Sequence, residues 1–126
     1  QATDPDHFAI YSGNDDVIVP LMSVGGSGVI SVLANALPRE THDMVAACLA
    51  GDYERARSIQ LALYPFIEAL FVEVNPVPIK AALNLLGLPS GSLRLPLSDA
   101  SEATVDRLRH ELQALGYLKK EVIGGV

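Results

Sequence analysis

The side chains in this sequence that could do chemistry are scattered, and most have a simpler structural explanation. His7, His42 and His110 lie on separate expected elements, without a paired histidine or cysteine nearby. A zinc site needs several such ligands brought together, so we predict no metal centre. Asp15 and Asp16 form a poor acid–base pair, because neighbouring residues on a helix do not face each other. Capping of a following helix explains the two acids better.

The most distinctive local motif is the glycine-rich stretch Gly25-Gly26-Ser27-Gly28. Glycine-rich loops bind phosphate where they open a helix. Here the apolar run Val29-Ile30-Ser31-Val32 follows at once, which is typical of a strand. We therefore expect a tight turn that enters a strand, and no phosphate cradle.

Two apolar runs, residues 7–11 and 28–33, are the expected strands. Both runs are continuous rather than alternating, which is typical of strands buried on both faces of a parallel sheet. About twenty residues separate them, enough for one crossover helix, expected over residues 16–24. Two strands do not make a stable sheet, so the chain looks like part of a larger parallel β/α structure.

Helical patterns dominate the rest of the chain. Glycines end three of the expected helices, and apolar spacing defines their buried faces. Val45, Cys48 and Leu49 form the expected inner face of the first of these helices. The first three expected helices cover residues 38–50, residue 52 to the residues before Asn75-Pro76, and residues 78–86. Asp52 is the expected cap of the second of these helices, and its inner face includes Leu63 and Phe66.

The last expected helix is capped by Ser98, Asp99 or Ser101 and is closed by Gly116. Its expected inner face includes Leu108 and Leu112.

Composition narrows the class of protein. The chain has 126 residues, is 49% hydrophobic and carries a net charge of -6, which fits one modest, well-buried domain. No basic cluster supports a nucleic-acid partner, and no apolar stretch is long enough for a membrane partner. No basic-then-apolar leader opens the chain, and the single Cys48 is expected to be an inert buried thiol. We therefore predict a cytoplasmic protein.

Four motifs in order carry a family resemblance. They are Ser12-Gly13-Asn14-Asp15, the stretch from Gly25 to Val32, Asn75-Pro76-Val77-Pro78-Ile79-Lys80, and Leu93-Arg94-Leu95-Pro96-Leu97. Together they resemble the carboxyl-terminal portion of a dihydrodipicolinate synthase (4-hydroxy-tetrahydrodipicolinate synthase), a pyruvate-dependent class I aldolase of the N-acetylneuraminate lyase family. The resemblance runs from about Phe8 to Leu118.

The resemblance implies an α/β fold that is mostly helical as it stands. Residues 8–12 would be strand seven and residues 28–33 strand eight of a (β/α)8 TIM barrel, with an α-helical carboxyl-terminal domain after them. Residues 1–51 would form the last two βα units, and residues 52–126 the helical domain. A complete barrel takes about 250 residues, so strands one to six are expected to lie upstream of Gln1.

The reaction implied by the resemblance is a condensation of pyruvate with aspartate semialdehyde in the diaminopimelate route to lysine. A lysine Schiff base with pyruvate carries it, without a cofactor or metal. The family's Schiff-base lysine and relay tyrosine match no position here, so the chain alone is predicted to be inactive. Lys80, Lys119 and Lys120 are poor substitutes, because none follows a predicted strand, where barrel active sites form. We expect Lys80 to pack along its stem and to reach a carbonyl or an acid.

By resemblance, two positions line the pyruvate pocket. The main chain at Ile30 would contact the pyruvate carboxylate, and Gly13 would let the backbone approach the substrate closely. The family often has aspartate where Asn14 stands, so this chain has one charge fewer at the rim.

Two alternatives stay open at this stage. The chain could come from another pyruvate aldolase of the same family, similar to N-acetylneuraminate lyase. It could also be a non-catalytic module, whose exposed strand edges are covered by self-association or by a missing amino-terminal barrel portion.

Overall fold

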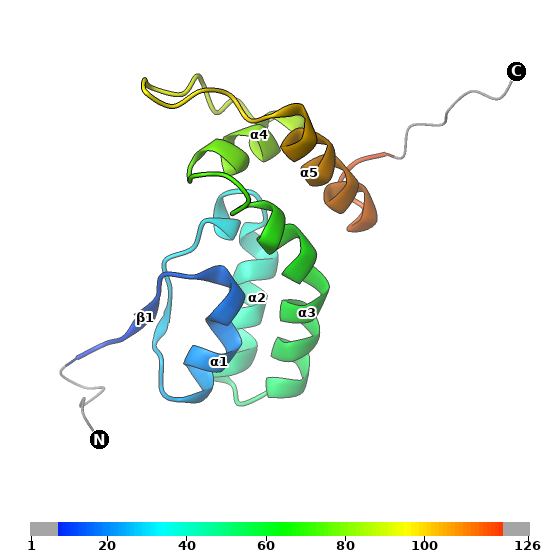
Figure 1. Ribbon diagram of the computed structural model, residues 1–126. Helices are drawn as coiled ribbons and strands as arrows, with labels where there is room; N and C mark the ends of the chain where they lie inside the picture. The colour runs from blue at the N-terminus through cyan, green and yellow to red at the C-terminus, as the bar shows by residue number, and fades with distance from the viewer. Residues whose placement is uncertain (1–7, 120–126) are drawn as a thin grey trace, which may run out of the picture. The chain divides into compact units, whose positions relative to one another are not determined.

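A computed structural model describes residues 8–119 of the chain (Figure 1). Contacts divide the chain into two compact units, one ending at Glu68 and the other beginning at Ala69. The described part is mostly helical, as predicted. Its elements in order are β1 (Tyr11–Ser12), η1 (Asp15–Val17), α1 (Ile18–Ser23), β2 (Gly28–Val29), η2 (Leu33–Asn35), α2 (Pro38–Leu49), α3 (Tyr53–Ala69), α4 (Val77–Leu85) and α5 (Glu102–Ala114).

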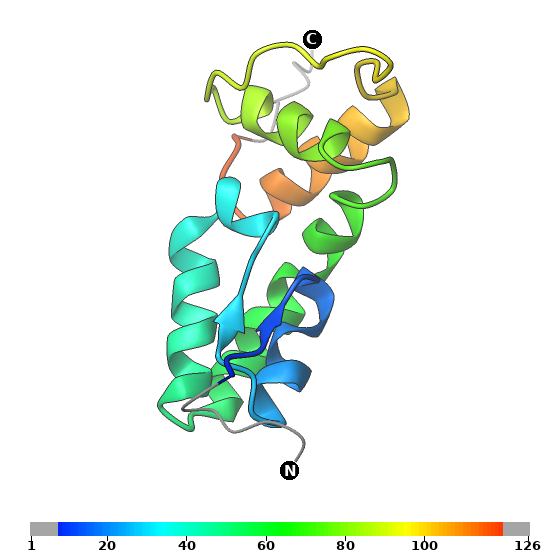
Figure 2. The same ribbon diagram turned by 90° about the vertical axis from the view of Figure 1, so that its left-hand side faces the viewer.

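The sheet of the first unit contains β1 and β2, which run parallel and side by side (Figure 2). Tyr11 lies opposite Gly28, and Ser12 lies opposite Val29. An added Cβ at Gly28 would lie 3.2 Å from the Tyr11 ring, so glycine leaves room for this aromatic side chain. The parallel pairing predicted from the continuous apolar runs is confirmed.

Both strands are shorter than predicted. Residue 7 lies outside the described residues, and residues 8–10 are not in regular strand, although Ser27 N donates to Ile10 O at 2.7 Å. The predicted strand 28–33 ends at Val29. The reason is that the amides of Val32 and Leu33 donate to a side-chain carboxylate and begin the 3₁₀ turn η2 instead of extending the ladder.

The segment between the strands is helical, as the crossover argument predicted. The turn η1 leads into α1, where Pro20 lies in the first turn and needs no amide partner. Gly25 ends the helix with φ of +102°, a conformation that favours glycine. Ile18 and Met22 are the buried residues of α1.

Helix α2 begins at Pro38, a position that tolerates the missing amide of proline, and ends before Gly51. Its predicted inner face is partly wrong, because the Leu49 side chain is 67% exposed. The buried stripe lies one position earlier along the helix. It comprises Thr41, Met44, Ala47 and Cys48.

Helix α3 has the N-cap that the sequence predicted, because Arg55 N donates to Asp52 Oδ1 at 3.0 Å. Leu63 and Phe66 are among its buried apolar residues, as the spacing predicted. The helix ends at Ala69, several residues before the predicted limit at Asn75-Pro76. A series of turns and bends covers the interval up to Pro76.

In the second unit, α4 packs against α5. Ser101 is the N-cap of α5, since its Oγ accepts from Thr104 N at 3.3 Å. Leu108 and Leu112 of α5 are fully buried, which confirms the predicted apolar face. No helix in residues 8–119 is long and apolar enough to cross a bilayer.

Candidate functional site

The structure brings Gly13 and Ile30, the two residues predicted to line a pocket, to the same end of the sheet. The register pairs Tyr11 with Gly28 and Ser12 with Val29, so the next step along both strands reaches Gly13 and Ile30. Ile30 N donates to Ser12 O at 2.8 Å, which joins the two segments at this point. In parallel β/α proteins, sites form at this carboxyl end of the strands.

Gly13 lies in open space. An added Cβ would meet no described atom within 4 Å, and its φ is not in the left-handed region. Neither packing within residues 8–119 nor backbone strain therefore requires glycine at this position. A ligand or another segment that approaches the main chain closely would require it.

Ser12 closes the turn that presents Gly13. Its side chain is 2% exposed. The hydroxyl donates to Asn14 O at 2.8 Å and accepts from Asn14 N at 3.2 Å. This local bonding holds the loop after β1 in one conformation. Sequence reasoning did not predict the role of the serine hydroxyl.

Asp15 caps a helical turn, but not the one predicted. The residue is 1% exposed, and its Oδ2 accepts from Val32 N at 3.0 Å and from Leu33 N at 2.9 Å. It therefore caps η2, the turn after β2, and not the helix that follows it in the chain. Asp16 is exposed, so the two acids do not form a catalytic pair.

Gln60 completes this buried polar network. It projects from α3, is 5% exposed, and donates from Nε2 to Asp15 O at 2.8 Å. Its Oε1 accepts from Val19 N at 3.2 Å. Sequence reasoning did not predict this contact, because it joins residues 45 positions apart and no local pattern marks it.

The structure describes two lysines, and both lie in the second unit. Lys80, in the second unit, donates from Nζ to Ser92 O at 2.8 Å, which confirms that its charge reaches a carbonyl. Lys119 is exposed, and Lys120 lies outside the described residues. Within residues 8–119, no group of three or more His, Cys, Asp or Glu side chains could hold a metal ion. His7 lies outside that range.

Cys48 is a buried thiol on α2, as predicted, and its side chain is 4% exposed. Burial raises the pKa of this thiol, because desolvation disfavours the thiolate. A neutral, buried thiol is a poor nucleophile, so Cys48 is a core residue.

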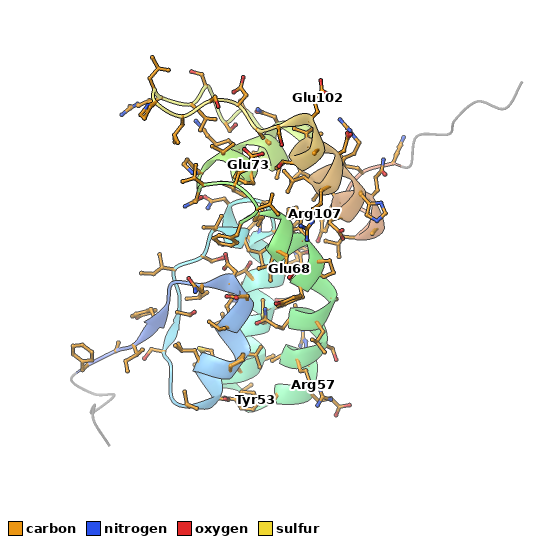
Figure 3. The ribbon with its side chains drawn as sticks, in the orientation of Figure 1. Tyr53, Arg57, Glu68, Glu73, Glu102 and Arg107 are labelled. Atoms are coloured by element: carbon orange, nitrogen blue, oxygen red, sulfur yellow. The ribbon has the colours of Figure 1, made fainter. Side chains whose placement is uncertain are left out.

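Two hollows are lined by residues other than Gly13 and Ile30. In the first unit, an open groove of about 770 Å³ lies between α1 and α3, with Val19, Leu61 and Tyr64 in its wall. Tyr53 and Arg57, labelled in Figure 3, line it from the first turns of α3. In the second unit, a hollow of about 280 Å³ is lined from α4, α5 and the segment between them. Neither hollow includes a predicted site residue.

Comparison with known proteins identifies the family. The sequence profile of the Dihydrodipicolinate synthetase family matches residues 1–115. This chain belongs to the dihydrodipicolinate synthetase family.

Relatives within this family are closely similar. A 4-hydroxy-tetrahydrodipicolinate synthase from Acetivibrio thermocellus is 50% identical over 114 residues, which are 90% of this chain and 39% of the relative. The crystal structure of dihydrodipicolinate synthase from Thermotoga maritima matches with a TM-score of 0.87 and 46% identity, over 90% of this chain and 38% of that chain. The chain thus spans about two fifths of the length of the synthases that it matches.

A third synthase has been solved with pyruvate. It is the enzyme from Acinetobacter baumannii, which matches with a TM-score of 0.83 and 35% identity, over 88% of this chain and 38% of that chain. The solved relatives are TIM-barrel enzymes of the synthase family, so this chain has the fold of a part of that barrel.

Proposed function

We propose that this chain is the carboxyl-terminal part of a 4-hydroxy-tetrahydrodipicolinate synthase, a lyase that condenses pyruvate with aspartate semialdehyde in lysine biosynthesis. The observation that carries the proposal is the match to synthases, at about half identity over nine tenths of the chain. Relatives named as synthases do not favour the alternative of a different pyruvate aldolase. A cytoplasmic location is part of the same proposal.

Within this proposal, β1 and β2 belong to barrel strands seven and eight. Residues 1–51 then form the last two βα units, and residues 52–126 the family's helical domain. The open sheet supports this assignment, because Tyr11 on β1 is 54% exposed, and Phe8 before β1 and Ile30 directly after β2 are 64% and 75% exposed. Apolar side chains on a two-stranded sheet indicate that further strands normally cover them.

The chain's contribution to the reaction is substrate binding. The main chain at Ile30 contacts the pyruvate carboxylate, and Gly13 lines the same pocket from the neighbouring strand. Ile30 N already donates to Ser12 O at 2.8 Å, and the Ile30 carbonyl only accepts, so a hydrogen bond to the carboxylate comes from an amide beside Ile30. Gly13 supports the assignment, because nothing in the described chain requires glycine there.

The covalent step falls to a residue outside this chain. A Schiff base forms when a lysine amine attacks the pyruvate carbonyl and water leaves, and the amine must be unprotonated to attack. Lys80 is held by Ser92 in the second unit and does not follow a strand. The isolated chain is therefore inactive, and an upstream strand of the complete barrel supplies the nucleophile.

A chimera tests the proposal. This chain replaces the matching carboxyl-terminal part, 38% of the length, of the Thermotoga maritima synthase, and turnover of pyruvate with aspartate semialdehyde is measured. We expect a folded, active lyase, and no turnover from the 126-residue chain by itself. A chimera that melts cooperatively but has no activity would contradict the proposal.

A further inference from the structure

Asp15 is a buried carboxylate that binds main-chain amides far from it in sequence. Its Oδ2 accepts from Val32 N at 3.0 Å and from Leu33 N at 2.9 Å. These are the first amides of η2, and Val32 itself makes no side-chain cap bond. Asp15 therefore fixes the direction of the chain two residues after Ile30.

Gln60 holds Asp15 in turn. Its Nε2 donates to Asp15 O at 2.8 Å, and its Oε1 accepts from Val19 N at 3.2 Å. Both ends of this buried amide are used, so α3 fixes the turn that carries Asp15. Gln60 thus positions Asp15, and Asp15 positions the segment after β2.

Ile30 is consequently held from two directions. On one side, Ile30 N donates to Ser12 O at 2.8 Å. On the other side, Asp15 fixes the amides of Val32 and Leu33. Main-chain atoms cannot adjust to a ligand by changing a side-chain rotamer. The geometry of a main-chain contact therefore depends on the hydrogen bonds that fix the backbone around it.

The Asp15 carboxylate is only partly satisfied by its hydrogen bonds. Asp15 Oδ1 is buried and has no hydrogen-bond partner in the described part of the chain. Burying a carboxylate costs free energy that two hydrogen bonds only partly return. An apolar residue would avoid this cost but would leave the amides of Val32 and Leu33 without their acceptor, so the carboxylate is kept at the position where it fixes these two amides.

We propose that Asp15, supported by Gln60, is a positioning residue for binding of pyruvate at the main chain of Ile30. The inference rests on the proposed function, since Ile30 is the contact that it serves. Asp15 and Gln60 act through the main chain and not by touching the substrate. Loss of either side chain shifts the segment after β2 and weakens pyruvate binding more than it affects later steps.

The experiment uses the chimera with the Thermotoga maritima synthase, and compares Asp15→Ala, Asp15→Asn and Gln60→Leu. We expect Asp15→Ala and Gln60→Leu to raise the KM for pyruvate about tenfold, with a smaller change in kcat. Asp15→Asn keeps an oxygen that can accept from both amides, so its KM should stay within about twofold. Rescue by asparagine separates positioning from a need for charge.

Thr41→Val is the matched control. Thr41 is 4% exposed, and its Oγ1 donates to Leu37 O at 2.8 Å within the same unit. The variant loses a buried hydrogen bond that involves neither Asp15 nor Gln60, so its Tm should fall while its KM for pyruvate stays unchanged. If the KM for pyruvate rises in Thr41→Val as much as it does in Asp15→Ala for the same fall in Tm, the increase reflects lost stability and the inference is overturned.

The outcomes also separate this inference from the proposed function. A folded but inactive parent chimera overturns both. An active parent whose KM is unchanged by Asp15→Ala overturns the positioning role alone. If Asp15→Ala does not fold, Gln60→Leu decides, because it leaves the carboxylate in place, and an unchanged KM then overturns the inference.

Discussion

Gly13 and Gly26 lie in the same unit but differ in how closely other atoms approach them. An added Cβ at Gly13 meets no described atom within 4 Å, whereas at Gly26 it would lie 3.0 Å from Leu21 O and 2.5 Å from Leu21 Cδ2. Gly26→Ala should therefore lower the free energy of unfolding by about 1–3 kcal/mol. Gly13→Ala should change it by less than about 0.5 kcal/mol.

Gly13→Ala, which should leave stability almost unchanged, should affect activity. In the chimera, Gly13→Ala should raise the KM for pyruvate several-fold, because the new Cβ occupies the space that the proposed pocket needs. Urea unfolding of each variant measures the change in stability, and steady-state kinetics measure the change in the KM for pyruvate. A Gly13→Ala chimera with parental KM would show that Gly13 does not line the pocket.

Glu73 ties the segment before α4 to the start of α5 within the second unit; Figure 3 labels it together with Glu102, the first residue of α5. Glu73 Oε1 accepts from Ser101 N at 3.0 Å, Ser101 Oγ at 2.8 Å and Thr104 Oγ1. The hydrogen bonds from Thr104 and Ser101 hold the pKa of Glu73 below its usual range. Because the folded pKa is the lower one, the stabilisation is present near neutral pH and is lost as pH falls through the folded pKa.

Glu73→Gln tests this pH dependence. The amide mimics the protonated acid, so the variant should melt at a lower Tm than the parent at pH 7. The difference in Tm should shrink as pH falls through the lowered pKa of Glu73, where the parental carboxyl also becomes neutral. Thermal melts of both proteins across this range measure it, and a constant difference would count against an ionised Glu73 as the stabilising form.

Residue roles that depend on local pattern could be predicted, and those that depend on distant contacts could not. The N-cap Asp52 bonds an amide three residues on, so spacing alone indicated it. Asp15 looked like a local cap, but its partners are 17 and 18 residues away. Gln60 had no sequence signal at all, because only the fold brings it to Asp15.

At the level of elements, α3 offers a matched pair of leucines. Leu63 is 3% exposed and Leu61 is 64% exposed. Leu63→Ala should lower the free energy of unfolding by about 2–5 kcal/mol, because it removes buried methyl groups and leaves a cavity. Leu61→Ala should cost less than about 0.5 kcal/mol. Urea unfolding of the two variants measures the contrast, and equal losses would show that α3 packs in a different register.

Helices were better predicted than strands. Proline at the start and glycine at the end defined α2, since both act through their own backbone. The strand prediction 28–33 was too long, because an apolar run cannot reveal that Asp15 takes the amides of Val32 and Leu33. The Leu49 prediction was wrong because the buried stripe of α2 was read one position too far along the helix.

For the molecule as a whole, the chain spans about two fifths of the length of the synthases that it matches. In residues 8–119 the sheet has two strands, and Tyr11 on β1, Phe8 before it and Ile30 after β2 are exposed. The family and the barrel origin could be predicted from four ordered motifs, which lie within the matched residues 1–115. The reaction chemistry could be predicted only by resemblance, since no pattern of residues in this sequence indicates it.

The most direct test of the central claim is borohydride trapping of pyruvate, with intact mass and peptide mapping as the readout. The isolated 126-residue chain and the chimera are each incubated with pyruvate and reduced. We predict one adduct on the chimera, on a peptide from the Thermotoga maritima part, and none on the isolated chain. A pyruvate adduct on any lysine of this chain, or a folded chimera that forms none, would contradict the account.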